Sequence, residues 1–242
     1  MDELQAMREQ ITVALRAARS PLDAADALCQ TCVELLDVDG AAISVIHDGA
    51  SRGTFGSSGE LSRRLDDYQF TFGEGPCLDS VRLQRPVFAP DLADPSDSRW
   101  PFFAGAVLAE GVAAVFALPI TLAVRAVGAL DLFCEAPRPL TPVALRGGLL
   151  AAELAASPLL DLLSGDLDVD RSGPGEDGWA QLASLERVEV YQATGMIMGA
   201  LAIPSTEALL RLRAYAFAHG LTAQEVAVLV LERQLPAGLD AS

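Results

Sequence analysis

A short segment near the C-terminal end places an arginine and a tyrosine at helical spacing. Arg187, Tyr191, Thr194 and Met198 stand at positions i, i+4, i+7 and i+11, so a helix would present all four on one narrow face. A guanidinium pairs with phosphate, and a tyrosine ring stacks on an unpaired base. The pattern therefore predicts an RNA-binding face. The alternative, which composition statistics favour, is a face that packs against a neighbouring domain or a second copy with Tyr191 half-buried.

Two further arginines lie in the next predicted helix, which begins at an N-cap, Ser205, and ends at Gly220. Arg211 falls on the polar side of this helix, where Glu207 is one turn away and can form an ion pair with it. Arg213 falls inside the apolar arc, where an uncompensated charge is costly. We expect Arg213 to pair with an acid; the alternative is a groove in which it meets phosphate.

A third helix is predicted to begin at Thr222, which has the capping-box spacing to Glu225. Glu225 and Glu189 are the acids that we expect to pair with Arg213. Most of the third helix is apolar, and its charged stripe, Glu225 and Glu232, would repel RNA. We therefore expect it to pack inward and to contact neither RNA nor, as the recognition helix of a helix-turn-helix would, DNA.

Four cysteines are the other residues with reactive side chains. Cys29 and Cys32 have the C-x-x-C spacing of redox and metal sites, and Cys77 and Cys134 could complete a four-thiolate site. The first pair lies within a predicted amphipathic helix, so we interpret both as core residues and predict no metal site. Cys77 follows a glycine-rich turn at a helix start, where the helix dipole lowers a thiol pKa; packing of a small residue is the favoured interpretation.

The charge of the chain argues against strong attraction to nucleic acid. Its 242 residues, a length typical of one or two domains, carry a formal net charge of −16, and all 17 basic residues are arginines. Residues 1–163 carry 12 arginines against 22 acids, a balance of −10, whereas residues 179–242 carry 4 against 6, a balance of −2. The C-terminal part is therefore the least acidic.

Location is predicted from what the sequence lacks. No apolar run approaches the ~18–20 residues that span a bilayer, and the acidic start, Met1-Asp-Glu, lacks the basic residues of a signal peptide. Cysteines in such a chain are expected to stay reduced. These observations predict a cytoplasmic protein without a membrane partner.

The elements that must position these residues follow from hydrophobic periodicity and turn signals. Residues 41–47, 113–120 and 128–134 are near-continuous apolar runs that suit central strands, and residues 86–90 are a candidate short strand. Helices are expected at residues 4–15, 21–36, 61–68, 76–83, 101–110 and 141–163. Ser20 is the predicted N-cap of the second of these, with Pro21 at its first position. Residues 164–178 combine glycine, proline and acids, and predict a flexible linker.

The N-terminal part resembles a GAF domain of the kind found with ANTAR domains in actinobacteria. The resemblance covers residues 18–163 and depends on five motifs: Gln69-Phe-Thr-Phe-Gly-Glu-Gly-Pro-Cys-Leu-Asp79, Arg85-Pro-Val87, Asp91-Leu-Ala-Asp94, Arg99-Trp-Pro101 and Gly128-Ala-Leu-Asp131. It implies an α+β domain over residues 1–163, with an antiparallel sheet flanked by helices. It also implies a small-molecule effector, of unknown identity, near Phe70, Cys77, Asp91, Trp100 and Phe116.

The C-terminal part resembles an ANTAR domain, an all-α three-helix bundle that binds RNA hairpins and suppresses transcription termination. The motifs are Arg187-Val-Glu-Val-Tyr-Gln-Ala-Thr-Gly-Met-Ile-Met198, Leu212-Arg-Ala-Tyr-Ala216 and Thr222-Ala-Gln-Glu-Val-Ala227. The resemblance implies an RNA-binding domain over residues 179–237 and a homodimer on the RNA. Arg187, Thr194 and Arg213 stand at family positions, but Thr194 replaces the usual lysine and so removes one phosphate contact.

These patterns together predict a transcription antitermination regulator in which a GAF sensor controls an RNA-binding ANTAR output. The alternative is a dimeric signalling scaffold with a protein–protein output, which the net charge and Thr194 favour. A third reading is a cysteine-dependent methionine sulfoxide reductase, an activity of some GAF domains. Because that reading leaves the C-terminal module unexplained, we expect the protein not to be an enzyme.

Overall fold

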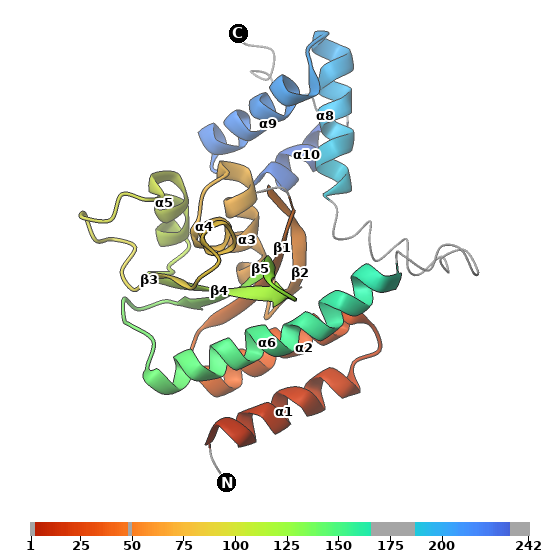
Figure 1. Ribbon diagram of the computed structural model, residues 1–242. Coiled ribbons are helices and arrows are strands. Elements are labelled where there is room, and N and C mark those ends of the chain that lie inside the picture. The colour runs from red at the N-terminus through yellow and green to blue at the C-terminus, as the bar shows by residue number, and fades with distance from the viewer. Residues whose placement is uncertain (1–2, 48–49, 166–186, 233–242) are drawn as a thin grey trace.

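The computed structural model describes residues 3–47, 50–165 and 187–232, and its centre is a five-stranded antiparallel sheet (Figure 1). The strands lie in the order β2-β1-β5-β4-β3. Their bounds are β1 Gly40–His47, β2 Ala50–Ser57, β3 Val87–Ala89, β4 Ala114–Leu122 and β5 Arg125–Cys134. Because β5 lies between β1 and β4, the apolar runs predicted as central strands hold the middle of the sheet.

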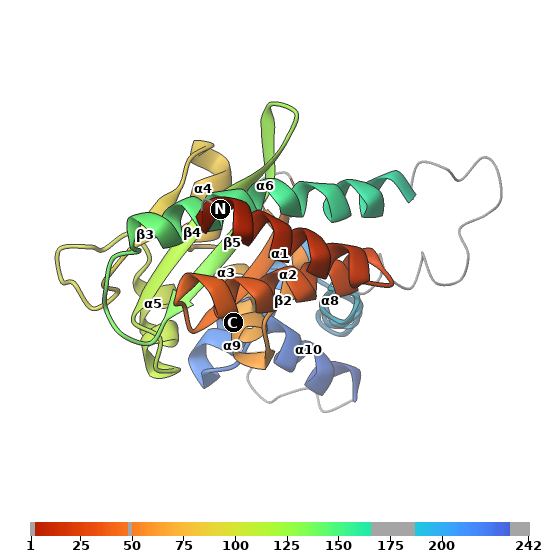
Figure 2. The same ribbon diagram turned by 90° about the horizontal axis from the view of Figure 1, so that it is seen from below.

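One face of the sheet is covered by α1 (Glu3–Ala17), α2 (Pro21–Leu36) and α6 (Pro142–Gly165). Figure 2 shows these three helices together on that face. Alternate residues of the strands, such as Phe116, Leu118 and Leu132, point into one apolar cluster with α2 and α6. The Ser20 hydroxyl accepts a hydrogen bond from the Asp23 N–H, which confirms the predicted N-cap of α2.

The opposite face is covered by α3 (Glu60–Phe72), α4 (Pro76–Leu83) and α5 (Pro101–Ala109). The intervening strand positions, among them Val115 and Ala117 of β4, pack under α3 and α5. Both faces of the central strands are therefore buried, which confirms the two-sided position predicted from their continuous apolarity. The predicted helices and the short third strand are all present within a few residues of their expected bounds, except that α3 extends to Phe72.

Strand β2 was not among the sequence predictions. Its residues, Ala-Ser-Arg-Gly-Thr-Phe-Gly-Ser, include two glycines and lack alternating apolar side chains. It lies at the edge of the sheet, where only β1 pairs with it. Gly56 packs so closely on the α2 backbone at Ala25 that a Cβ would collide with it. Tertiary pairing and close backbone approach, rather than β propensity, account for this strand.

The C-terminal helices are α8 (Val188–Leu201), α9 (Ser205–His219) and α10 (Ala223–Leu231). They enclose an apolar core to which α8 contributes Val190 and Ile197, α9 Leu212, and α10 Val226. Gly220 ends α9 in the left-handed conformation, as predicted (φ 65°). The capping box of Thr222 and Glu225 is also confirmed. Helix α10 packs inward, and Val226, Ala227 and Val230 are buried as expected.

Ser205 is not the N-cap of α9, contrary to the prediction. It is the first helical residue, and Pro204 holds the cap position without a side-chain hydrogen bond. The proline already supplies the extended backbone that a cap residue needs, so the helix begins without a hydroxyl acceptor. The predicted linker at 164–178 and the first residues of the predicted C-terminal domain, which was expected to begin at residue 179, fall largely outside the described residues.

Although the sequence was expected to hold no apolar run long enough to span a bilayer, helix α6 is long and apolar enough to do so by length and composition, over Pro142–Leu162. Half of that segment is buried in the molecule, where it packs on α2 and on the sheet. The bent pair α8 and α9 passes the same test as a unit, although the two helices meet at 108°. Such segments are weak evidence for a membrane span, because core helices have the same properties.

Candidate functional site at the joint between the sheet and the C-terminal helices

A buried polar network lies between α3 and the sheet. Asp66 of α3 is fully buried, and its carboxylate accepts hydrogen bonds from the hydroxyls of Ser44 on β1 and Thr54 on β2, the latter at 2.6 Å. These two hydroxyls face each other in the strand register. The sheet therefore supplies donors for one carboxylate but no cation, although a buried carboxylate needs compensation.

Gln69 extends this network by one helical turn. Its Nε2 donates to Asp131 Oδ2 at 2.6 Å, and its Oε1 accepts from the backbone N–H of Cys77 at 2.8 Å. Gly75 makes this arrangement possible, because it has a φ of 145° and a Cβ there would collide with the Gln69 amide. Burial, and then the charge of Asp66, raise the pKa of Asp131 well above its ordinary value. Asp131 Oδ1 has no hydrogen-bond partner among the described residues.

The cation for this network comes from the C-terminal part of the chain. Arg187, at the N-cap of α8, is only 6% exposed, and its guanidinium forms ion pairs with Asp66 at 3.4 Å and with Asp67. Burial raises the pKa of Asp67, while Arg187 acts in the opposite direction. Arg187 also lies over the ring of Phe70, 4.3 Å from its centre. The sheet network and the C-terminal helices therefore meet at one guanidinium.

Arg213 also lies over Phe70, and the ion pair that we expected for it is not formed. Its guanidinium is 4.4 Å from the ring centre, and its Nε is buried without a partner in the described part of the chain. Of the expected acids, Glu225 pairs with Arg64 and Glu189 accepts from Gln224. Burial, and then the charge of Arg187, lower the pKa of Arg213. Cation–π contact, which the sequence pattern did not indicate, replaces the acid.

The four residues predicted as an RNA-binding face are divided by the structure. Tyr191 is 46% exposed, whereas Arg187 and Thr194 are buried. The Thr194 hydroxyl donates to the Val190 carbonyl at 2.6 Å, and Met198 is half-buried against the C-terminal core. In this arrangement only Tyr191 presents its functional group to solvent. For Arg187 the geometry agrees with the alternative interpretation, a face that packs on the neighbouring domain. The Arg211–Glu207 ion pair is formed as expected, at 2.8 Å.

The five residues predicted to surround an effector are not brought together. Phe70 points into the C-terminal core, and Phe116 packs on the opposite face of the sheet with α2 and α6. Trp100 is buried with α3 and α5, and Cys77 belongs to a separate small cluster on α4. Asp91 is exposed in a loop. Phe116 lies on the opposite face because side chains alternate along a strand. Phe70 is covered because the C-terminal helices dock on α3.

All four thiols are free and buried. Burial is the largest cause that raises the pKa of Cys29 and of Cys77, and it raises the pKa of Cys32 to about 12. Burial also raises the pKa of Cys134. At Cys77 this desolvation, together with Asp131 and Asp66, outweighs any lowering by the start of α4. The structure thus agrees with the interpretation of the cysteines as core residues, since nucleophilic thiols need an accessible thiolate.

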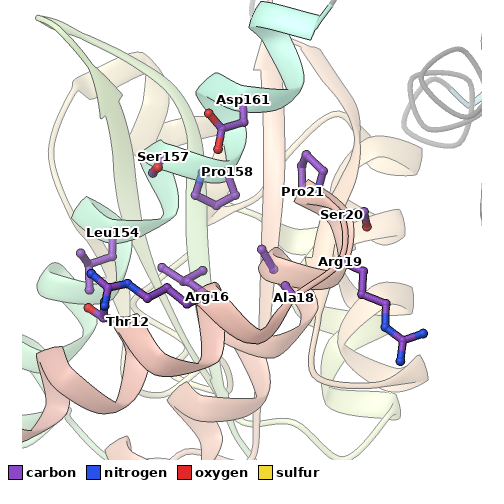
Figure 3. A pocket seen from close by; sticks show the side chains of 12 residues that line it. Thr12, Arg16, Ala18, Arg19, Ser20, Pro21, Leu154, Ser157, Pro158 and Asp161 are labelled. Atoms are coloured by element: carbon purple, nitrogen blue, oxygen red, sulfur yellow. The ribbon is translucent and has the colours of Figure 1, made fainter. Parts of the chain in front are cut away.

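Two open pockets lie away from this joint. One, of about 580 Å³, lies between α1, the start of α2 and α6. Figure 3 shows that the guanidinium groups of Arg16 and Arg19 there point away from each other, so they do not converge on a common ligand. The other, of about 640 Å³, is bordered by α4 and the β4–β5 hairpin, with Arg82 and Arg125 in its wall. It lies on the same face of the sheet as the polar network.

Sequence reasoning missed Asp66 and Asp67, which hold Arg187. The one available signal was Asp66 itself, an acid in the middle of a predicted helix and one turn from buried Phe70 and Gln69. A helical wheel would have placed these side chains toward the interior, and a buried carboxylate demands a partner. The partner, 121 residues further along the chain, could not be identified from local pattern.

The sheet order, the helices on both faces and the buried network define an α+β fold of the type used in small sensor domains. The sequence model of the GAF domain matches residues 18–157, which is 140 of the 242 residues. The chain therefore belongs to the GAF domain family, and this identifies a sensor and signalling domain. No curated protein matches the chain.

Two GAF domains are among the solved structures that share this fold. The GAF domain of a phosphoenolpyruvate-protein phosphotransferase from Acinetobacter superposes with a TM-score of 0.55 at 11% identity, covering 69% of this chain and 99% of that domain. The corresponding GAF domain from Coxiella burnetii superposes with a TM-score of 0.54 at 16% identity, covering 68% and 97%. At these identities the likeness concerns the fold alone.

Proposed function

We propose that this protein is a regulator in which the GAF domain controls an RNA-binding output formed by α8–α10. The output would be an ANTAR domain that binds RNA hairpins and promotes antitermination in the cytoplasm. Ala193, Gly195 and Met198, which belong to the motif that resembles the ANTAR family, lie on α8, and the three helices are compatible with a helical bundle. The GAF domain would receive a small-molecule effector, and two copies of the chain would engage the RNA.

The observation that carries this proposal is the contact of α8 with the GAF network. The first helix of the motif begins at Arg187, whose guanidinium compensates a carboxylate buried under the sheet. This ion pair joins an arginine of the output helices to a carboxylate of the sensor domain. A change at the carboxylate can therefore act directly on the output helices. Tyr191, one turn further along α8, is exposed and free to stack on an unpaired base.

The test is RNA binding by the full chain and by Tyr191→Ala. Gel shifts at moderate salt would use tandem hairpins and a scrambled RNA of equal length. Because stacking contributes about 1–3 kcal/mol per base, Tyr191→Ala should weaken hairpin binding by roughly five- to a hundredfold. Leu210→Ala, at a 65% exposed apolar position on α9, is the matched control and should leave the affinity unchanged. Equal affinity for hairpins and scrambled RNA would exclude the proposed output.

A signalling scaffold with a protein–protein output is the second candidate. The net charge of −16 opposes RNA, and one face of α8 is exposed and uncharged, with Gln192, Gly195, Met196 and Gly199. Under this candidate, Tyr191→Ala would leave the affinity for RNA as low as before while a dimer persisted in sedimentation. We further propose that the chain is not an enzyme, and the burial of all four thiols supports this by denying a reductase its nucleophile.

A further inference from the structure

Helix α3 belongs to two cores at once. Toward the sheet it presents Asp66 and Gln69, which hydrogen-bond to strands β1, β2 and β5. Toward the C-terminal helices it presents Phe70, which is buried in their apolar core. A residue of the GAF domain thus completes the interior of the output module. Displacing α8–α10 would expose this apolar surface and leave the Phe70 ring without its two arginines.

Contacts of α3 reach each of the three C-terminal helices. Arg64 bonds Glu225 of α10 at 2.6 Å, and the Thr71 hydroxyl accepts from the backbone N–H of Ala223 at 2.9 Å. Phe217 of α9 packs edge-on against Phe72. Helix α8 is held through Arg187. Because α3 contacts all three helices, we take it as the element of the GAF domain that positions the output.

The same contacts engage Arg187 and Arg213, the two arginines that the sequence pattern offers as partners for RNA phosphate. Arg187 is buried between Asp66 and Asp67, and both Arg187 and Arg213 lie over Phe70. Two carboxylates and an aromatic ring are the chemistry that competes most directly with a phosphate for a guanidinium. While α3 holds them, Arg187 is only 6% exposed and the Arg213 guanidinium is occupied by the Phe70 ring, so neither is available to pair with a phosphate.

We propose that α3 is an autoinhibitory latch that holds Arg187 and Arg213 away from RNA. The latch opens when another group takes the place of Arg187 as the partner of the Asp66 carboxylate. This inference rests on the proposed function and adds its regulation. When the latch is open, Asp66 keeps only the hydroxyls of Ser44 and Thr54. An effector that enters the sheet face of the GAF domain and donates to this carboxylate, as a cation or a strong hydrogen-bond donor does, therefore favours release.

Two substitutions weaken the latch without altering a residue assigned to RNA. Asp67→Asn removes a charged partner of Arg187, and Arg64→Gln removes the bond to Glu225. Asparagine has the shape of aspartate, so the substitution removes the charge without leaving a cavity. The matched controls are Asp37→Asn and Arg138→Gln, which break an ion pair of 2.6 Å on the far side of the sheet with the same changes of charge.

The experiment measures two quantities on each full-length protein: amide hydrogen exchange of α8–α10 and affinity for tandem hairpin RNA. If the closed latch lowers the fraction of binding-competent molecules, the apparent affinity falls by that fraction. Asp67→Asn and Arg64→Gln should therefore increase exchange in α8–α10 and tighten RNA binding about tenfold. Both controls should match the wild type in both measurements.

The two measurements separate the latch from the proposed function. Unchanged exchange in both latch variants would overturn the latch, whatever the RNA result. Faster exchange with unchanged or weaker RNA binding would show that α3 docks the helices without masking RNA, and would also overturn it. Faster exchange with no hairpin binding by any of the proteins would instead reject the RNA-binding function, and the latch with it.

Discussion

The two faces of the GAF sheet differ in the polarity of their buried side chains. The face under α2 and α6 is apolar throughout, with Leu118, Leu132 and Phe116 in one continuous cluster. The face under α3 and α4 has apolar clusters at its ends and a polar network between them, formed by Ser44, Asp66, Gln69, Asp131 and Thr54. The two faces are made by alternate residues of the same strands.

This difference shows which face can carry a signal. An apolar face is stabilised in proportion to buried area, and a small change in a ligand or in pH has little to act on. A buried polar network depends on charge and on matched partners, so it has discrete arrangements that a ligand can favour. The C-terminal helices dock on the polar side, where Arg187 joins the network. The apolar face serves as scaffold.

The largest expected effect tests the apolar face. Leu118→Ala should lower the free energy of unfolding by about 2–5 kcal/mol, because Leu118 is fully buried and the substitution leaves a cavity. Urea denaturation measures the loss. Val124→Ala is the control, since Val124 is 94% exposed in the β4–β5 turn and its substitution should change stability by less than about 0.5 kcal/mol. Equal losses in the two variants would contradict the scaffold role of this face.

The pH dependence of stability should distinguish the polar face from the apolar face. The pKa of Asp131 is raised in the folded protein, so the folded state holds a proton that the unfolded chain releases. As pH rises from about 4 toward the raised pKa, this group should therefore cost up to about 1.4 kcal/mol of stability per pH unit. Asp131→Asn should remove that dependence.

Urea denaturation of wild type and Asp131→Asn between pH 5 and 8 is the measurement. The variant should gain stability relative to the wild type as pH rises. Parallel pH profiles would mean that Asp131 is ionised in the folded protein at no cost, and would remove the contrast between the faces. Leu118→Ala provides the reference, because its loss should be the same at every pH in this range.

The fold of the GAF domain was largely predictable because its signals are local. Turn residues bound the central strands, and Ser20-Pro21 marks the start of α2. Strand β2 escaped prediction because its sequence is polar and glycine-rich, and only its pairing with β1 makes it a strand. The extension of α3 to Phe72 also escaped, because its last turn is stabilised by contacts with helices far along the chain.

The candidate site was less predictable because its contacts join distant segments. Helical spacing correctly placed Tyr191 and Thr194 on α8, whereas Arg187 is the N-cap of that helix, and the spacing could not show which neighbour covers the face. The sequence correctly indicated that Arg213, on an apolar face, needs a partner for its charge. That partner is an aromatic ring of α3, however, and not the expected acid. Side-chain types indicate what a residue needs, and only the tertiary structure shows which of several partners provides it.

The smallest expected effect concerns the polar rim of α3. The Tyr68 hydroxyl donates to Glu110 at 2.6 Å and accepts from Arg64, and burial followed by the Glu110 hydrogen bond raises the pKa of Tyr68 to about 12. Its contribution to stability is therefore complete below pH 10 and is lost as pH rises toward 12. Tyr68→Phe should cost about 1 kcal/mol at neutral pH and remove the phenol that ionises near pH 12. Ultraviolet titration of phenolate absorbance, with urea denaturation alongside, checks both. If the late-ionising phenol persists in Tyr68→Phe, the rim of the polar face does not have the hydrogen bonds on which its contrast with the apolar face depends.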